Sequence, residues 1–449
     1  MGIGILSLIV FIGVILIWFL VVKRSIGESM FLGFIAICAL GGKDAFVLFY
    51  EGVKYAATYE VLYAALAFVV MAYIFDLSGV LEGLINILNS LLGRIPGGAA
   101  FMDVIASGAL GLISGSTTGN VAARGVFTIP WMKKTGFSDE LATTIASGNA
   151  GMAVGFPPNA SMFILLGLAP IAAQVSEGQL YLAMLIAGTY QILWRFLIVG
   201  FFIKKNKIKG VTENVRPIKE TLKEGWPSLF VFLGAAIPIL LTMSPIAVFL
   251  GSENMVGPEG MDTISLITWM PIVISFICIV LGWKNFPKNG KGWIKIAESS
   301  ISKFSSIGAV LLFAFAASNV LGLLGMGEEL TAFLGSLSIA PWLMVIIVGA
   351  IVVLVACPLS STATLTVVGL VAYSALTSVG VNPVFAVAAV LAWASTEGES
   401  MPTSGGIYVA AGIAESNPAK SFVPLFVYYV IPVMAIGWMM CWGWLPLPV

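Results

Sequence analysis

The chain has 449 residues, of which 59% are hydrophobic and 10% are charged, and its 22 basic and 22 acidic side chains leave a formal net charge of zero. With a mean hydropathy of +1.03, the composition excludes an ordinary soluble domain and predicts a multi-pass protein of the lipid bilayer; nothing in it indicates a nucleic-acid partner. The absence of His excludes His proton relays and most zinc chemistry. Because the apolar runs are about 20 residues long, helices are favoured over a barrel.

Residues 1–60 are predicted to form scaffold spans. The apolar run from Ile3 to Val22 has neither a preceding basic stretch nor a small-residue cleavage site, so we interpret it as an uncleaved span rather than a signal peptide. Lys23 and Arg24 follow it, and the positive-inside rule places that loop in the cytoplasm and the N-terminus outside. A second span is expected before residue 50.

The first of two repeats is predicted at residues 61–205. A span at 61–75 is expected to end at Asp76, and the amphipathic segment 81–92 is too short to cross a bilayer. Residues 97–131 contain two apolar arms around the polar stretch ISGSTTGN. Basic residues flank both ends, so we expect a re-entrant hairpin that enters and leaves on the cytoplasmic side.

A broken helix and a full span complete this repeat. Residues 139–174 are interrupted from Gly155 to Pro158, within the motif VGFPPN, and a span at about 180–203 follows. Residues 206–303 then begin with a basic cytoplasmic loop and contain two further scaffold spans.

The second repeat, residues 304–449, follows the same order as the first. After a span and a short amphipathic segment come a hairpin at 341–375 around PLSSTAT, a broken helix at 382–416 around STEGESMPTS, and a last span at 422–444. Adding 244 to a residue number superposes the interruptions without a gap, carrying Ser116 onto Ser360, Gly136 onto Gly380 and Pro158 onto Pro402.

The basic loops make hairpin one open from the cytoplasm and hairpin two from the outside, so the repeats are inverted relative to each other. Polar interruptions that coincide in two inverted halves are typical of secondary transporters. We therefore predict an all-α integral membrane protein with an inverted repeat, two re-entrant hairpins and two broken helices.

The interruptions in the helices can supply binding groups for ions and for a substrate. At bilayer depth an unpaired N–H or C=O group is costly unless protein, water or a ligand satisfies it. Unwound carbonyls and Ser, Thr and Asn side chains offer oxygen ligands for a small cation, whereas the N-termini of half-helices offer N–H groups to an anion. Four interruptions in register therefore predict binding sites rather than four simple kinks.

Three ionisable residues lie in or beside the interruptions: Arg124, Glu397 and Glu399. Charges within a membrane are functional by default. Arg124 has two interpretations, which the sequence leaves open. Its guanidinium either clamps a substrate carboxylate through a bidentate contact, or pairs with Glu397 or Glu399 and only fixes the structure.

The motifs GRIPGG, ISGSTTGNVAARGVFTIPWMKKTGF, GFPPN, PLSSTATL and MPTSGGIYVAAGIA resemble the large membrane subunit of tripartite ATP-independent periplasmic (TRAP) transporters, over about residues 60 to 430. The resemblance implies an elevator-type symporter in the bacterial inner membrane. Such a carrier imports an organic anion with sodium as the coupling ion and no other cofactor. The implied partners are a small four-helix membrane subunit and a periplasmic substrate-binding protein.

The resemblance also implies two sodium sites and a substrate site. The first sodium site maps to the hydroxyls of Ser114 and Thr117 with carbonyls near Ala153, Phe156 and Pro158. The repeat offset then gives the second site, Ser361 with carbonyls near Glu397, Ser400 and Pro402. The substrate residues map to the two hairpin tips and their surroundings, at Ser116, Thr118, Asn120, Arg124, Thr362, Thr364 and Ser404. The family commonly has Asp at the positions of Asn120 and Ser360, which leaves the substrate and the coupling stoichiometry open.

Two other classes of function are alternatives to this prediction. One is a stand-alone ion exchanger or dicarboxylate carrier of the same superfamily, which needs no binding protein. The other is a membrane enzyme or scaffold, but the sequence shows no nucleophile–base pair, metal-ligand cluster or soluble catalytic domain. We therefore expect a transporter and not an enzyme.

Overall fold

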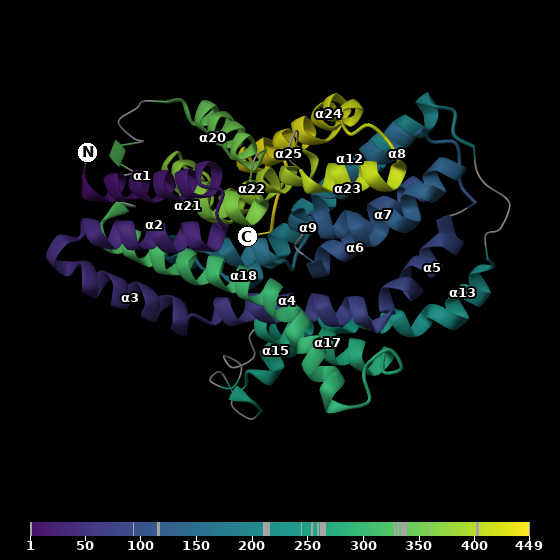
Figure 1. Cartoon of the computed structure of the whole chain (residues 1–449), viewed down its shortest axis with the longest axis horizontal. Helices are drawn as coiled ribbons and strands as arrows, with labels where there is room; N and C mark the ends of the chain where they lie inside the picture. The colour runs from purple at the N-terminus through teal and green to yellow at the C-terminus, as the bar shows by residue number, and fades with distance from the viewer. Residues whose placement is uncertain are drawn as a thin grey trace.

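The computed structural model describes residues 2–92, 94–114, 117–209, 216–243, 245–252, 255–257, 260, 266–326, 329, 332–333, 339–357, 359–400 and 404–448. Throughout these ranges the regular structure is helical (Figure 1). Three helical segments within them are long and apolar enough to cross a membrane, Glu177–Lys205, Ser361–Ser378 and Ala419–Cys441. Many large apolar side chains face outward, including Phe46, Leu197 and Leu354, as expected for a surface that meets lipid.

The first helices pack against one long helix from the middle of the chain. Figure 1 shows α2 and α3 beside α18, and close contacts join the three. Ser25 caps α2 by accepting a hydrogen bond from the amide of Glu28, which satisfies one free N–H of the first turn. The elements of this group are α1 (Ile3–Leu16), η1 (Ile17–Val21), α2 (Ile26–Leu40), η2 (Gly42–Asp44), α3 (Ala45–Thr58) and α18 (Gly290–Leu323).

Two expected boundaries in this region are wrong. Helix α4 (Glu60–Ser78) continues through Asp76 and ends at Gly79, whose φ of 75° is the left-handed conformation that terminates helices. Helix α18 begins at Gly290 rather than near 307, so Lys291 and Lys295 lie on the helix. Lys291 and Lys295 do not prevent the helix from starting earlier, because both are exposed and a long Lys side chain can follow the helix surface to water.

A second group of elements surrounds the amphipathic helix α5 (Val80–Leu92). It packs on α13 (Ile218–Gly225) and η3 (Trp226–Phe232), and Thr221 donates a 2.7 Å hydrogen bond to Ser90 across that contact. Farther along the chain, α14 (Leu233–Met243) and α15 (Pro245–Leu250) precede α17 (Leu266–Leu281), which packs against α4 and α14. Segment 328–337 of the second repeat, expected to match α5, falls mostly outside the described residues.

The first repeat continues as a series of shorter helices. Helices α6 and α7 pack against each other, and their connection, residues 115–116, is outside the described ranges. Between α8 and α9 the helix is interrupted at residues 149–151, before the second interruption that the motif VGFPPN predicts. The bounds are α6 (Gly98–Ser114), α7 (Thr117–Lys134), α8 (Asp139–Gly148), α9 (Met152–Gly155), α10 (Ala160–Leu166), α11 (Ala169–Ala172) and α12 (Glu177–Lys205).

The second repeat has helices at nearly equivalent positions. The offset of 244 carries α7 onto α21 residue for residue and brings the start of α8 to the start of α22. The bounds are α20 (Pro341–Ala356), α21 (Ser361–Ser378), α22 (Pro383–Ala394), the 3-10 turn η4 (Ser395–Glu399), α23 (Gly405–Ala414), α24 (Ala419–Leu425), the π turn η5 (Phe426–Val430) and α25 (Ile431–Cys441).

Two hydrophobic cores hold these elements together. The smaller core joins α6, α7 and α8 to α23, with Ile129, Ile145 and Ile407 at its centre. The larger core contains α1 to α4, α18, α20, α21 and α22. Figure 1 shows α7 and α23 side by side, and contacts confirm it. Helices of the two repeats therefore share one core around the interruptions.

Candidate substrate and ion site

The N-termini of two helices, one from each repeat, meet at the carboxylate of Glu397. Thr117, the first residue of α7, donates a 2.7 Å hydrogen bond from its hydroxyl to Oε2 of Glu397. The backbone N–H of Ser361, the first residue of α21, donates to the same carboxylate. We call Thr117, Ser361 and Glu397 the Glu397 site. The N-termini of two helices favour negative charge, and here that charge comes from the protein itself.

Close backbone packing fixes this arrangement. A Cβ added to Gly398 would lie 3.0 Å from Cβ of Thr117 and 3.1 Å from the backbone nitrogen of Gly151. A side chain at residue 398 would therefore push η4 away from α7 and from the interruption between α8 and α9. The absence of a Cβ at this one position lets the two interruptions lie side by side.

A second group of polar residues lies in the smaller core beside the Glu397 site. Arg124 on α7 forms a fully buried ion pair with Asp103 on α6. Its Nε donates to Oδ1 of Asn120 at 2.7 Å. Asp103 also accepts from the hydroxyl of Thr128 at 2.6 Å and from the side-chain amide of Asn149 at 2.8 Å. Asp103, Asn120, Arg124, Thr128 and Asn149 are called the Arg124 network.

A second buried ion pair joins Arg195 on α12 to Glu399 on η4, and both side chains are fully shielded from solvent. The same guanidinium donates from Nε to the carbonyl of Gly148 at 3.2 Å and from Nη1 to the carbonyl of Gln191 at 3.3 Å. One guanidinium therefore connects α12, the end of α8 and η4.

The two arginines complete the hydrogen bonding at the end of α8. A helix leaves its last four carbonyls without helical partners. The carbonyls of Ile145 and Ser147 accept from the next turn of backbone, while those of Ala146 and Gly148 accept from Arg124 and Arg195 respectively. Cations at the C-terminal end of a helix are favourable. At this interruption the protein supplies its own positive groups.

The pairing of Arg124 with Glu397 or Glu399 is therefore wrong. Arg124 pairs with Asp103, and Glu399 pairs with Arg195. The other interpretation, a clamp on a substrate carboxylate, stays a prediction. In this structure the Arg124 side chain is fully buried and contacts protein groups on three sides.

The residues predicted to bind sodium are only partly brought together. Thr117, Ser361 and Glu397 meet as described, whereas Ser400 donates its hydroxyl to the carbonyl of Thr396 at 2.6 Å. The carbonyl of Phe156 accepts from the side chain of Asn159 at 2.8 Å. Of the remaining predicted ligands, Ala153 and Pro158 are buried near that interruption, Pro402 is outside the described residues, and the side chain of Ser114 is likewise not described.

The predicted substrate residues divide into exposed and buried groups. Thr118 and Thr362 are partly exposed beside the Glu397 site, whereas Thr364, Asn120 and Arg124 are buried. Ser404 is also buried, and its hydroxyl donates to the carbonyl of Gly398 at 2.9 Å. Ser116 is outside the described residues. Thr118 and Thr362 therefore have the accessibility that direct substrate contact requires.

Sequence reasoning missed Asp103 and Arg195. Both stand within apolar stretches, and a count of ionisable residues inside such stretches would have identified them as functional candidates. Their pairing has no sequence signal, because Asp103 meets a residue 21 positions away and Arg195 meets one 204 positions away.

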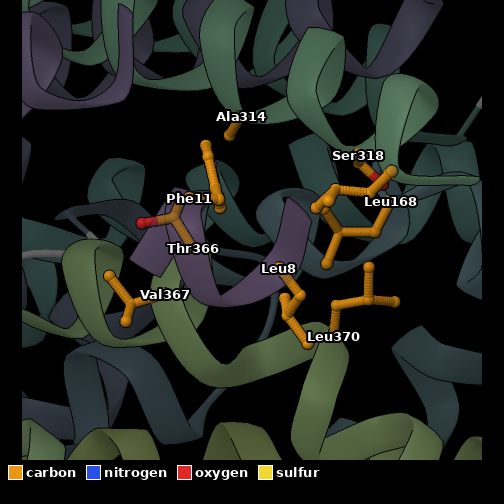
Figure 2. Close-up of a pocket in the computed structure, with 9 residues that line it drawn as sticks. Leu8, Phe11, Leu168, Ala314, Ser318, Thr366, Val367 and Leu370 are labelled. Atoms are coloured by element: carbon orange, nitrogen blue, oxygen red, sulfur yellow. The ribbon is translucent and has the colours of Figure 1, made fainter. Parts of the chain in front are cut away.

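A small cavity elsewhere is apolar. Figure 2 shows it between Leu8 and Phe11 of α1, Ala314 and Ser318 of α18, Thr366, Val367 and Leu370 of α21, and Leu168. The hydroxyl of Thr366 donates to a carbonyl of its own helix, and that of Ser318 accepts from the amide of Ala169. Because its few polar groups are already paired, this cavity is unsuited to a charged substrate.

Comparison with known proteins finds one family whose model matches nearly the whole chain. The family model for the DctM component of tripartite ATP-independent periplasmic transporters matches residues 3–442. A protein of Salmonella typhimurium named YgiK is 27% identical over 38% of this chain and 39% of its own. The isethionate TRAP transporter permease protein DctMQ of Oleidesulfovibrio alaskensis is 26% identical over 39% of this chain and 27% of its own. These matches span well under half the length of the relatives.

A solved structure shows the same overall fold. The chain resembles the YdaH transporter of Alcanivorax borkumensis with a TM-score of 0.66 and 16% identity, over 91% of each chain. The family match confirms the resemblance that the hairpin and di-proline motifs carry. The chain therefore belongs to the DctM-component family of TRAP transporters, which consists of multi-pass permeases of the bacterial inner membrane and not of enzymes.

Proposed function

We propose that this permease imports a small organic acid together with sodium, by an elevator movement, after a periplasmic binding protein has delivered the substrate. The observation that carries the proposal is the Glu397 site, where the first residues of α7 and α21 meet the interruption η4. Helix N-termini from both repeats at one place are the arrangement by which inverted-repeat carriers bind a charged substrate.

In this proposal α6–α7 and α20–α21 are the two re-entrant hairpins, and α8–α10 and α22–α23 are the two broken helices, with their interruptions near the middle of the bilayer. Residues 1–60 and 206–303 supply the scaffold. The polar contacts support a moving body made from both repeats, because Lys133 donates to the carbonyl of Ala414 at 2.7 Å and Thr143 contacts Ser416 at 2.7 Å. The apolar cavity beside α1 and α18 then lies where α21 meets the scaffold (Figure 2).

The coupling ion gives the first prediction. Uptake of the transported acid into proteoliposomes should vanish when sodium is replaced by potassium or choline at constant pH, because the hydroxyl and carbonyl oxygens at the two interruptions favour a small hard cation. Full uptake driven by a proton gradient in the absence of sodium would show that sodium is not the coupling ion.

The inverted repeat gives the second prediction. In a variant without Cys38, Cys278, Cys357 and Cys441, new cysteines at Lys134 and Lys209 should react only with a cytoplasmic reagent. A cysteine at Glu259, which lies outside the described residues, should react only from the periplasm. These sides follow from the basic loops. Labelling of residue 134 from the periplasm would remove the inverted orientation from the proposal.

The need for partners distinguishes the proposal from its main alternative. We expect uptake only when the purified chain is combined with a small membrane subunit and a binding protein, as the family's tripartite name implies. Sustained uptake by the chain alone would instead favour a stand-alone exchanger or dicarboxylate carrier.

A further inference from the structure

The buried charges around the interruptions do not balance. Arg124 pairs with Asp103, and Arg195 pairs with Glu399, so two positive and two negative side chains compensate each other. Glu397 is a fifth charge. Within the described residues it forms no ion pair, and its partners are the hydroxyl of Thr117 and the amide of Ser361.

No nearby residue outside the described ranges supplies the missing positive charge. The residues that precede α7 and α21 or follow η4 and are not described are Gly115, Ser116, Pro358, Met401, Pro402 and Thr403, and none of them is basic. A carboxylate removed from bulk water without a cationic partner is unfavourable. The Glu397 site therefore calls for a positive group that neither the described residues nor the undescribed residues beside the site supply.

The carboxylate of Glu397 is accessible to a ligand. The four paired side chains are fully shielded from solvent, whereas Glu397 is partly exposed, next to Thr118 and Thr362 at the same helix ends. An ionised carboxylate has about four lone-pair positions, and the two hydrogen bonds from Thr117 and Ser361 occupy only part of them. The remaining positions can accept hydrogen bonds from a ligand.

The groups that contact the Glu397 carboxylate suit a bound ammonium group better than a metal ion. A small metal cation needs several oxygen ligands at once, whereas the two described groups that contact the carboxylate, the hydroxyl of Thr117 and the N–H of Ser361, both donate hydrogen bonds to it. Among the described residues no group of three acidic, Cys or His side chains gathers. An ammonium carries its own three donors and needs only the free lone pairs of one carboxylate.

We propose that the Glu397 carboxylate binds a positively charged nitrogen group of the substrate, so that the transported organic acid is a zwitterion. A dianion is disfavoured because its second carboxylate would meet Glu397 at the helix ends that Glu397 already occupies. This inference rests on the proposed function, since it specifies the substrate of the same site.

The test is protection of Glu397 from an apolar carbodiimide, which couples to accessible carboxylates within membranes. The purified full-length chain in nanodiscs is labelled in sodium buffer, and modification at residue 397 is followed by mass spectrometry. The probes are methylammonium, 4-aminobutyrate and succinate, each compared with buffer alone. Because an amine can capture the activated carboxylate as an amide and free carboxylates consume the reagent, labelling is scored as the loss of unmodified Glu397, with carbodiimide in excess over the probe. A bound ammonium must give up its hydrogen bond to the carboxylate before the carboxylate can react. The two amines should therefore slow labelling by about tenfold or more, whereas succinate should not.

Matched controls come from the same chain. Glu399, buried and paired with Arg195, should stay unlabelled throughout, and Glu397→Gln should lose only the label at 397 while retaining its thermal melt. The same variant should bind 4-aminobutyrate about tenfold more weakly in a direct titration, because it loses the charge.

Three outcomes would overturn the inference. Protection by sodium alone, against choline, would make Glu397 a ligand of the coupling ion. Protection by succinate but not by the amines would show an anion site, and protection by none of the probes would show that no cationic group is received. The proposed function is judged separately by sodium-dependent uptake: loss of that dependence with intact protection by the amines leaves the substrate inference standing.

Discussion

Arg124→Ala is expected to lower the free energy of unfolding by about 3–5 kcal/mol, because it leaves a fully buried carboxylate at Asp103 without its partner. Asn120 and the carbonyl of Ala146 lose hydrogen-bond donors at the same time. Arg124→Lys should cost about 1–3 kcal/mol, since an ammonium keeps the charge but not the planar set of donors that reaches all three groups. Thermal and denaturant unfolding of the purified chain measure both effects.

A second change identifies the partner. Asp103→Asn should restore most of the stability lost in Arg124→Ala, because it removes the unpaired charge. Glu399→Gln should not restore it. Lys133→Ala is a control on the same helix: its bridge to Asp139 and its hydrogen bond to the carbonyl of Ala414 involve a side chain that is not fully buried, so it should change stability by only about 1 kcal/mol. An unaltered melt combined with weaker substrate binding in Arg124→Lys would instead support a clamp on the substrate.

The sequence predicted the helical fold class and the matching helix positions of the two repeats because hydropathy and the repeat offset are local or periodic signals. The residues of α7 and α21 correspond without a gap under the offset of 244. The interruption at residues 149–151 was missed although Gly148, Asn149 and Gly151 are poor helix formers, because they carry a weaker signal than the two prolines that follow. It is stabilised by groups distant in sequence, since Arg124 and Arg195 take up carbonyls at the end of α8.

The site was only partly predictable for the same reason. The motifs assign Thr117 to one predicted sodium site and Ser361 with the carbonyl of Glu397 to the other, and the sequence could not show that the Glu397 carboxylate joins the two helix ends. The assignment of Arg124 to Glu397 or Glu399 failed because only the residues near the interruptions were considered. Asp103 and Arg195 stand one helix away, and tertiary packing alone decides which charges meet.

Arg195→Ala is expected to be as destabilising as Arg124→Ala, by about 3–5 kcal/mol, because Glu399 would remain charged and buried without a partner. Arg195→Ala also removes the donor to the carbonyl of Gly148.

Arg195→Ala should also weaken substrate binding, and this loss should persist when the stability of the fold is restored. Arg195 connects α12 and the end of α8 to η4, which carries Glu397, so its loss should displace the Glu397 site even in molecules that fold. In the double variant Arg195→Ala with Glu399→Gln, we expect the melt to recover while substrate affinity stays reduced. Recovery of both would make the ion pair purely structural. Rescue of the melt by Asp103→Asn in place of Glu399→Gln would contradict the pairing itself, because the two ion pairs are then not independent.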